Sequence, residues 1–503
     1  IKVIIAKYFR EQSMGHSEIK NQAASKYEKQ LESWINQKKA AVSLNNSVGS
    51  LLYEKSIELV LFRNLLVEQS VSDVLRLHKY AEDVVNKPIS IFDSAELAEI
   101  IGKMDLIPSR IDIGKLAYEW QESHNGHSNK VDFIADKLSD FIQKEDQPLV
   151  PKDVILYGFG RIGRLAAREL IKNTGRGQQL RLRAIVTRSS SDNDIVKRAS
   201  LLRTDSVHGP FSGTIIEDLD NKALVINGQI VHMIQASNPD QVDYTSYGIN
   251  NALVIDNTGA FRDREALGLH LKSKGVGNAL LTAPGKGIPN VVYGVNHDGL
   301  DIDNEHIYSA ASCTTNAIVP ILKVINDNLG IEKGHIETVH AYTNDQNLLD
   351  NMHKKSRRGR SAAINMVITE TGAGKAVTKV IPELSNKLTA NAVRVPTPNG
   401  SLAIMNLSIS KETTVEEVNG LLKNAALSGD LISQIYYSID EELVSNDIIG
   451  NGCCSVFDSP ATIVHPDQRN VILYVWYDNE YGYTRQVMRL AKHISKVRRA
   501  TYY

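Results

Sequence analysis

The sequence has few cysteines and no long apolar run. Its 503 residues include three cysteines, two of them adjacent at Cys453 and Cys454, so we expect no disulfide framework and a reducing compartment. No apolar stretch approaches the ~20 residues of a membrane-spanning helix, and the opening Ile1–Ala6 is too short for the apolar region of a signal peptide. These absences predict a cytoplasmic protein that does not enter a membrane.

An excess of charge of either sign is also absent. The formal net charge of -1 at pH 7 gives no global electrostatic reason to bind nucleic acid or a membrane surface. We find no internal repeat, no low-complexity segment and no residue spacing typical of a metal site. A hydrophobic share of 42% and a charged share of 23% are ordinary for a globular protein, and the length predicts two or three domains.

Glycine is scarce in residues 1–150, which hold 5 of the 33 glycines. Apolar spacing in this part is typical of helices, and a segment over residues 51–85 carries repeated apolar pairs. One helical face would carry Tyr27, Leu31, Trp34 and Ile35. Because proline stops helices, Pro148 and Pro151 mark a boundary. We therefore predict an all-α extension over residues 1–150.

Beyond the boundary, short β-branched runs alternate with helical stretches, which predicts a parallel sheet. The first run ends at Tyr157, and Gly158, Gly160 and Gly163 follow it as a GxGxxG at the start of a helix. In such a motif the first glycine allows a tight turn, the second admits a pyrophosphate to the backbone, and the third lets helix and strand pack closely. The pattern predicts a dinucleotide site.

One cysteine lies among hydroxyl side chains in the segment Ala310–Pro320, and a histidine follows in Thr338–Gln346. Cys313 fits a nucleophile, and His340 fits the group that would hold it as a thiolate. The alternative is a buried cysteine and an unrelated core histidine, since both residue types often simply pack.

Together with further motifs in the same order, this pair resembles the glyceraldehyde-3-phosphate dehydrogenase family over about residues 151–497. The further motifs are Tyr157–Arg164, Asp256–Phe261, Val393–Asn399 and Trp476–Tyr483. The resemblance is to a long form with an extra N-terminal helical domain. It implies an α/β fold with a Rossmann-like nucleotide domain over 151–312, a mixed α/β catalytic domain over 313–478, and a C-terminal helix, about 479–503, packing back on the nucleotide domain.

The resemblance implies a phosphorylating aldehyde dehydrogenase. Glyceraldehyde 3-phosphate would be oxidised with NAD(P) and inorganic phosphate to 1,3-bisphosphoglycerate, reversibly, through a thioester on Cys313. His340 would serve as an imidazolium partner and as the base. The implied cofactor-binding residues are Gly158, Gly160, Arg161, Ile162, Gly163, Arg188, Thr258, Gly259, Thr282 and Asn479. The substrate phosphate would contact Thr343, Asp345 and Arg394, and inorganic phosphate would contact Ser312, Thr314, Arg360, Thr371 and Gly372.

Three departures from the family pattern bear on specificity. Arg188 stands where NAD-using members usually carry an acidic residue, and a guanidinium beside several hydroxyls suits a 2′-phosphate. The loop after His340 has Asn351-Met352 where NAD-linked relatives often have Leu-Pro. Both favour NADP over NAD. Glu370 stands where relatives usually have Ser or Thr, and a carboxylate would weaken phosphate binding there unless it points away.

Alternatives remain at this stage. The substrate of a related enzyme would be another phosphorylated aldehyde, such as erythrose 4-phosphate. A different class is a cofactor-binding regulatory or interaction protein with vestigial catalysis. The family implies a homotetramer. The role of residues 1–150 stays open between covering an oligomer surface, regulating cofactor access and binding another protein.

Overall fold

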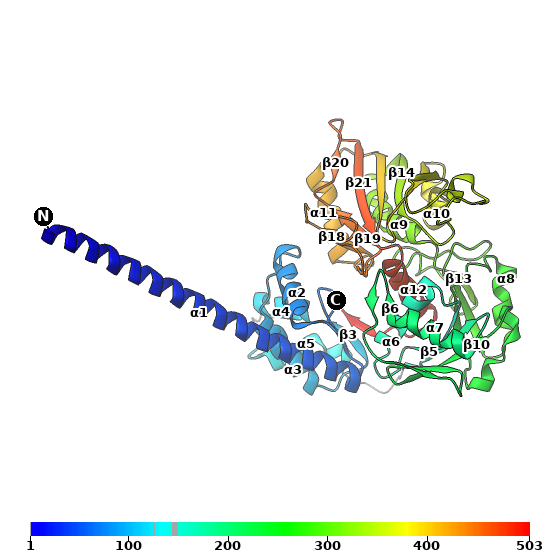
Figure 1. Ribbon diagram of the computed structural model, residues 1–503, viewed down its shortest axis with the longest axis horizontal. Helices are drawn as coiled ribbons and strands as arrows, with labels where there is room; N and C mark the ends of the chain where they lie inside the picture. Colours follow the sequence, from blue (N-terminus) through cyan, green and yellow to red (C-terminus); the bar gives the residue numbers. More distant parts are fainter. Residues whose placement is uncertain (1, 124–125, 143–148) are drawn as a thin grey trace. The chain divides into compact units, whose positions relative to one another are not determined.

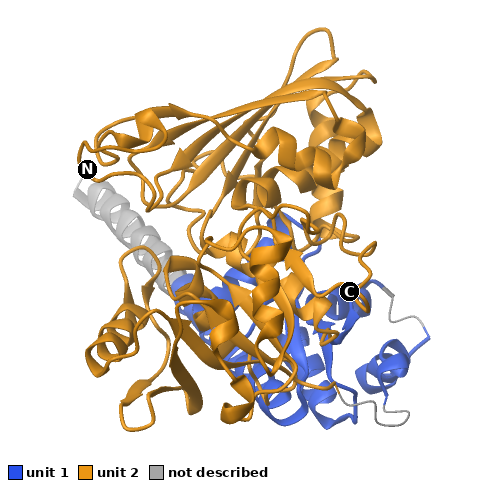
Figure 2. Cartoon of the chain, turned by 90° about the vertical axis from the view of Figure 1, so that its right-hand side faces the viewer, with its two compact units in different colours: residues 1–147, 499–503 blue, residues 148–498 orange. Residues whose placement is uncertain are grey.

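The computed structural model describes residues 2–123, 126–142 and 149–503, with side chains from residue 25 onward. The chain forms two compact units, coloured separately in Figure 2. The first consists of residues 1–147 together with 499–503, and the second of residues 148–498. Among the described residues, no helix combines the length and the apolar content needed to cross a membrane.

Five α-helices and a small sheet build the first unit. The helices are α1 (Lys2–Lys55), α2 (Val71–Asp83), α3 (Ile91–Lys103), α4 (Ile113–Ser123) and α5 (Lys130–Lys137). The sheet has the order β2 (Asn64–Leu65), β1 (Glu58–Leu61), β3 (Ser109–Asp112) and β22 (Ala500–Tyr502). Its core joins Leu44 and Leu51 of α1 to residues of the other helices, such as Leu97 and Phe133, and Figure 1 shows α3 beside the C-terminal part of α1.

This sheet corrects the prediction that the extension is all-α. Residues 51–85 hold the end of α1, two strands and α2, instead of continuous helix. All four residues of β1 are buried, and a short, fully buried apolar run cannot be told from a buried helical segment by periodicity. The fourth strand comes from residues 500–502, within the segment predicted as a C-terminal helix, and pairs parallel with β3.

The second unit contains an eight-stranded sheet with a parallel core. Its order is β13 (Ile307–Ser309), β12 (Val276–Leu281), β11 (Ala252–Asp256), β4 (Lys152–Tyr157), β5 (Leu180–Thr187), β10 (Gln229–Gln235), β9 (Ala223–Ile226) and β8 (Ile215–Asp218). The strands from β13 to β10 are parallel, and β9 and β8 are antiparallel. Helices α6 (Arg161–Lys172), α7 (Asp192–Arg203) and α12 (Tyr481–Ile494) contribute to one core beneath it.

A second sheet of the same unit is mixed. Its main path runs β15 (Val367–Thr369), β16 (Leu388–Val395), β14 (Ile331–Ala341), β17 (Ser401–Ile409), β21 (Asn470–Tyr477), β19 (Ser455–Asp458) and β18 (Ile435–Ser438), and β20 (Ile463–Val464) pairs with β21. Helix α9 (Cys313–Leu329) packs against this sheet and against α10 (Ala373–Val380) and α11 (Val415–Leu427). The predicted fold class, a Rossmann-like parallel sheet with a second mixed α/β part, is confirmed.

Candidate active site

The glycine motif forms the turn between β4 and α6. Gly158 has φ +93°, which favours glycine, and a Cβ there would lie 2.9 Å from Cγ2 of Thr258. A Cβ on Gly163 would lie 2.4 Å from the carbonyl oxygen of Gly158, so helix and turn approach as closely as backbone allows. Gly160 is the N-cap of α6 and brings no side chain to the helix terminus. The backbone N–H groups and the positive helix end therefore suit a pyrophosphate.

The loops after β11 and β12 are held in place by Asp256. Its carboxylate accepts hydrogen bonds from the backbone N–H and hydroxyl of Thr258, at 2.8 and 2.7 Å, and pairs with the buried His270 at 2.9 Å. Thr282 donates its hydroxyl to the Asp256 carbonyl at 3.0 Å. Gly259, next to Thr258, has φ +63°. The parallel sheet thus brings Thr258, Gly259 and Thr282 to the same edge as the glycine motif.

Arg188 is exposed directly after β5. The neighbouring hydroxyls are partly engaged, because Ser189 and Ser191 both donate to the Asp194 carboxylate. The serines therefore shape the start of α7, where Ser191 is the N-cap, and 2′-phosphate binding by Arg188 stays a prediction.

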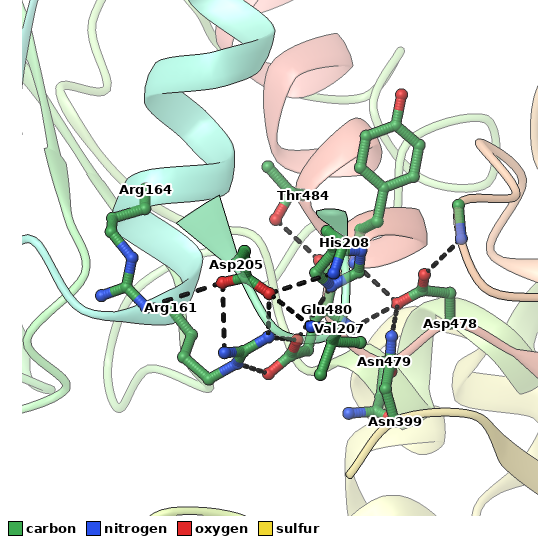
Figure 3. Close-up of polar contacts among 12 residues, drawn as sticks. Arg161, Arg164, Asp205, Val207, His208, Asn399, Asp478, Asn479, Glu480 and Thr484 are labelled. Atoms are coloured by element: carbon green, nitrogen blue, oxygen red, sulfur yellow. Dashed lines mark hydrogen bonds and ion pairs between the residues drawn. The ribbon is translucent and has the colours of Figure 1, made fainter. Parts of the chain in front are cut away.

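The side chain of Arg161 links two carboxylates and is not directed at a phosphate. Its guanidinium donates to Glu480, at 2.6 Å from Nη2, and to Asp205, at 3.2 Å from Nη1 and 3.1 Å from Nη2 (Figure 3). His208 also contacts Glu480 at 2.9 Å. Hydrogen bonds from the backbone N–H groups of His208 and Val207, and then Arg161, hold the pKa of Asp205 below its usual value. Hydrogen bonds from His208 and Arg161 do the same for the pKa of Glu480. The cofactor role predicted for Arg161 is thus left to its backbone N–H, and the side chain fixes the segment beside Asn479.

Asn479 has its amide oxygen occupied. Ser401 donates its hydroxyl to Asn479 Oδ1 at 2.8 Å, and the same Ser401 oxygen accepts the backbone N–H of Ala341 at 3.1 Å. The neighbouring Asp478 accepts from Asn399 at 2.8 Å and from backbone N–H groups, including that of Gly450 (Figure 3). The predicted contact of Asn479 with the cofactor would therefore be made by its amino group. The sequence analysis missed Ser401, whose only signal is its place just after the Val393–Asn399 motif.

Cys313 is the first residue of α9, and its Sγ lies 3.6 Å from Nε2 of His340 at the end of β14. The turn before it is fixed by Asn316, which donates to the Ala310 and Ser312 carbonyls, and Ala311 takes φ +54°. Left-handed backbone is uncommon for alanine and is typical of functional sites. The structure brings together the two residues predicted as the catalytic pair.

An arginine lies beside this pair and affects the pKa of both residues. Burial, and then the positive charge of Arg394, lower the pKa of His340 to about 3, so the ring is neutral. Arg394 Nη1 lies 2.9 Å from His340 Nδ1 and donates to the Ala341 carbonyl at 2.8 Å. Burial raises the pKa of the Cys313 thiol, and Arg394 opposes that rise. Arg394 is thus a second cationic group beside the thiol, and an imidazolium at His340 stays a prediction for the state in which the ring has taken up the thiol proton.

Two arginines and one carboxylate lie beside the pair. Arg394 Nη1 lies 3.4 Å from the Thr343 hydroxyl, which donates to Asp345. Arg358 pairs with Asp345 and donates to Thr369 at 3.2 Å. The positive charge of Arg358 also lowers the pKa of His340 and of Arg394, so it lies close to both.

Arg360, predicted to bind inorganic phosphate, lies elsewhere. It pairs with Asp350 at 2.9 Å, with 65% of its side chain exposed, whereas only 12% of the Arg358 side chain is exposed. The run Arg357-Arg358-Gly359-Arg360 offered three arginines, and sequence alone does not tell which of them turns inward.

The remaining predicted phosphate residues lie at helix starts. Ser312 caps α9 by accepting the backbone N–H of Thr315, and Thr314 lies 3.1 Å from the Tyr477 hydroxyl. Thr371 accepts the backbone N–H of Ala373, and Gly372 is the N-cap of α10. Glu370, next to Thr371, is exposed.

The parallel sheet, its glycine turn and the cysteine–histidine pair beside arginines are typical of a nicotinamide-dependent oxidoreductase. The family model for the glyceraldehyde 3-phosphate dehydrogenase NAD binding domain matches residues 152–264, and that for the C-terminal domain of the same enzymes matches residues 312–479. The chain belongs to the glyceraldehyde-3-phosphate dehydrogenase family.

Relatives fall into a long and a short kind. A glyceraldehyde-3-phosphate dehydrogenase-like protein of Pseudomonas aeruginosa is 48% identical over 454 residues, 90% of this chain and 98% of its own length. Glyceraldehyde-3-phosphate dehydrogenases of Priestia megaterium and Bacillus subtilis are 41% and 40% identical over 340 residues, 67% of this chain and 96% and 97% of their own. The Pseudomonas match is longer than residues 148–498, so it extends into the first unit.

Proposed function

We propose that the chain is a phosphorylating glyceraldehyde-3-phosphate dehydrogenase that prefers NADP. The observation that carries the reaction is the Cys313–His340 contact at 3.6 Å, with the Arg394 guanidinium held beside the same imidazole by the Ala341 carbonyl. We assign cofactor binding to residues 151–312 with helix α12, and catalysis to residues 313–478. Free thiols and the absence of a surplus charge support a cytoplasmic enzyme.

The first chemical step uses the neutral imidazole. With its proton on Nδ1, donated to the Ala341 carbonyl at 2.7 Å, His340 presents the Nε2 lone pair to the thiol and takes its proton. The thiolate, stabilised by Arg394, attacks the aldehyde carbon, and the former carbonyl oxygen receives the proton back from Nε2. Cys313 now carries a hemithioacetal.

The second step oxidises this adduct. The bound nicotinamide supplies a hydride acceptor. His340 Nε2 removes the hydroxyl proton as hydride leaves the carbon, which makes a thioester on Cys313. A phosphate oxygen then attacks the thioester carbon, and the leaving thiolate takes the proton held on His340 Nε2, so the products are an acyl phosphate, the free cysteine and a neutral imidazole. Asn479 would fix the carboxamide of the cofactor and so the face that receives hydride.

Two anions must be bound near Cys313. The arginines that lie beside the Cys313–His340 pair support this. Arg358 and Arg394 exceed the single charge of Asp345 by one, and arginine matches phosphate through two parallel hydrogen bonds. We assign Arg394 and Thr343 to the substrate phosphate and Arg358, in place of Arg360, to inorganic phosphate. The exposed position of Glu370 is compatible with a carboxylate that points away from phosphate.

Arg188 supports the cofactor preference, because its exposed guanidinium follows β5 where a ribose-binding carboxylate would exclude a 2′-phosphate. A homotetramer is supported by apolar side chains gathered on one loop and strand after His340. These are Leu348, Leu349, Met352, Ile364, Met366 and Ile368, each more than half exposed, and such a group marks an interface. Asn351 lies in the same loop and would reach the cofactor of a neighbouring subunit.

The test is a steady-state assay with glyceraldehyde 3-phosphate, with and without phosphate, comparing NADP and NAD by the absorbance of the reduced cofactor. Turnover that needs phosphate, prefers NADP and disappears in Cys313→Ser is the expected result. Turnover with erythrose 4-phosphate alone, or cofactor binding without turnover on either aldehyde, would refute the proposal.

A further inference from the structure

Residues 499–503 belong to the first unit, although the chain before them belongs to the second. The chain leaves the second unit at Arg498, and the segment 499–503 adds the strand β22 to the edge of the small sheet, beside β3. The buried core of the first unit comes entirely from residues 41–138, and of the segment only Tyr502 packs against it. The segment is therefore added to a unit whose core is built without it.

The segment is held as an extended peptide is held in strand addition. Residues 500–502 pair in parallel with residues 109–111 of β3. Main-chain pairing of this kind gives affinity for an extended segment, and side-chain pockets give specificity. The two middle residues, Ala500 and Thr501, are exposed. Specificity therefore depends on Arg499 and on the two tyrosines that end the segment.

The first two of these three side chains are bound by carboxylates. Arg499 has 4% of its side chain exposed and lies 3.6 Å from Glu58. Tyr502 donates its hydroxyl to Glu119 at 2.8 Å, and the Lys115 ammonium lies 4.6 Å from the centre of its ring. Hydrogen bonds to ionised groups and contacts of a cation with an aromatic face are stronger than neutral polar contacts. These contacts select an arginine followed by an aromatic residue with a hydroxyl.

The last side chain, Tyr503, is bound by three cations. Its hydroxyl accepts a hydrogen bond from Arg110 Nη1 at 3.1 Å, and its ring lies 5.3 Å from the centre of the Arg63 guanidinium. Its carbonyl oxygen accepts a hydrogen bond from Lys115. The contacts with ring and hydroxyl together select a second tyrosine.

Two of these cations are fixed by one buried carboxylate. Asp112 is 2% exposed and accepts the backbone N–H groups of Phe62, Arg63 and Lys115 at 2.8, 3.0 and 3.1 Å. Phe62 and Arg63 take φ +41° and +68°. Left-handed backbone is costly for such residues and is concentrated at ligand sites. The first unit thus holds a strained turn that presents Arg63.

The carboxylates of the site are also fixed by the first unit itself. Glu58 pairs with Arg110 at 2.5 Å, and Glu119 pairs with Lys137 at 2.9 Å. Groups that are already held in place lose little freedom when a ligand binds, which favours binding.

We propose that the first unit is a peptide-binding module. Its ligand is an extended segment with one arginine that is followed, three and four residues later, by two tyrosines. The chain carries one such ligand in residues 499–503, and a second protein with this pattern competes for the same edge of β3. The other pair of adjacent tyrosines in the sequence, Tyr436-Tyr437, has Ser433 in place of the arginine. The proposal does not depend on the proposed reaction.

The test uses the chain shortened by residues 499–503 and a fluorescent peptide with the sequence of residues 498–503. The peptide should bind the shortened chain saturably in fluorescence anisotropy. It should bind the wild type about tenfold more weakly or less, because there the chain's own segment has a high effective concentration. A peptide with the sequence of residues 433–437, which has the tyrosines without the arginine, should bind the shortened chain about tenfold more weakly. Equal binding of the two peptides, or no binding by a folded shortened chain, would overturn the proposal.

A pair of lysine variants of the shortened chain locates the site. Lys115→Ala removes the cation that contacts both tyrosines and should weaken peptide binding about tenfold. The matched control is Lys87→Ala, because Lys87 makes the same kind of contact with Tyr118, at 5.0 Å from the ring centre. This control should bind the peptide like the shortened chain. An equal loss in both variants would contradict the proposed site.

A full-length variant decides the outcome where the shortened chain does not fold, as judged by circular dichroism. Tyr502→Ser with Tyr503→Ser keeps the backbone of β22 and removes the ring contacts. The peptide should therefore displace this weakened segment and bind the variant more tightly than it binds the wild type. Equally weak binding to the variant and to the wild type would overturn the proposal.

Discussion

Ser401 offers a sharp test of how the active site holds the cofactor. Replacing it with alanine removes the donor to Asn479 Oδ1 and the acceptor of the Ala341 N–H, while both partners stay buried. The Asn479 amide is then free to turn and present its oxygen to the carboxamide. A buried neutral hydrogen bond contributes about 1 kcal/mol, so we expect kcat to fall about fivefold through lost orientation.

The matched control is Ser408→Ala on the same strand. Ser408 donates to Asn470 at 2.6 Å, as Ser401 does to Asn479, at the far end of β17 and β21. Both variants should lose stability in thermal unfolding, by about 2 kcal/mol or less for Ser408, but only Ser401→Ala should lose kcat. Ser401→Thr keeps the hydroxyl and should recover most of the rate. Equal kcat for Ser401→Ala and Ser408→Ala would refute a positioning role, provided the wild type is active.

Four further predictions concern three charged or titratable side chains and the close backbone contact at Gly163. Arg358→Ala should raise the KM for phosphate by about tenfold or more, while Arg360→Ala, measured in parallel, should stay near wild type; the reverse order would contradict the assignment. Arg188→Asp should exchange the preference from NADP to NAD in kcat/KM, and an unchanged ratio would show that Arg188 does not contact the cofactor. Gly163→Ala should abolish cofactor binding in calorimetry, because its Cβ would lie 2.4 Å from the Gly158 carbonyl oxygen. The pKa of His340 is about 3 in the folded protein, against 6.5 as the reference value for histidine. Below pH 6.5 the unfolded chain therefore binds one more proton than the folded chain, so the free energy of unfolding should fall as the pH drops. His340→Asn should flatten that part of the plot of Tm against pH, and an unchanged slope would refute the neutral ring.

The site could be predicted where function depends on short motifs at strand ends. Gly158, Cys313 and His340 lie where a strand passes into a turn or helix, so their neighbours in sequence indicate their place. Arg358 could not be chosen over Arg360, because tertiary contacts with Asp345 and Thr369 decide which side chain of an irregular loop turns inward. Ser401 was missed for a similar reason, since its partners Asn479 and Ala341 are distant in sequence.

The fold was predicted best where elements are long and periodic. The alternating strands and helices after residue 150 indicated a parallel sheet. In the first unit, β1 is too short and too fully buried to show a period of two. The strand β22 has no local signal for its partner, because its pairing with β3 joins residues about 390 positions apart.

That pairing has a consequence for synthesis. The edge of β3 is translated early, whereas the strand that covers it is translated about 390 residues later, which takes about 20 to 80 s at an elongation rate of about 5 to 20 residues per second. During this interval the first unit lacks an outer strand, and the ion pair of Glu58 with Arg499 has not yet formed. A ribosome that stalls within the catalytic part therefore leaves behind an open sheet edge, a feature that cellular proteases and chaperones recognise.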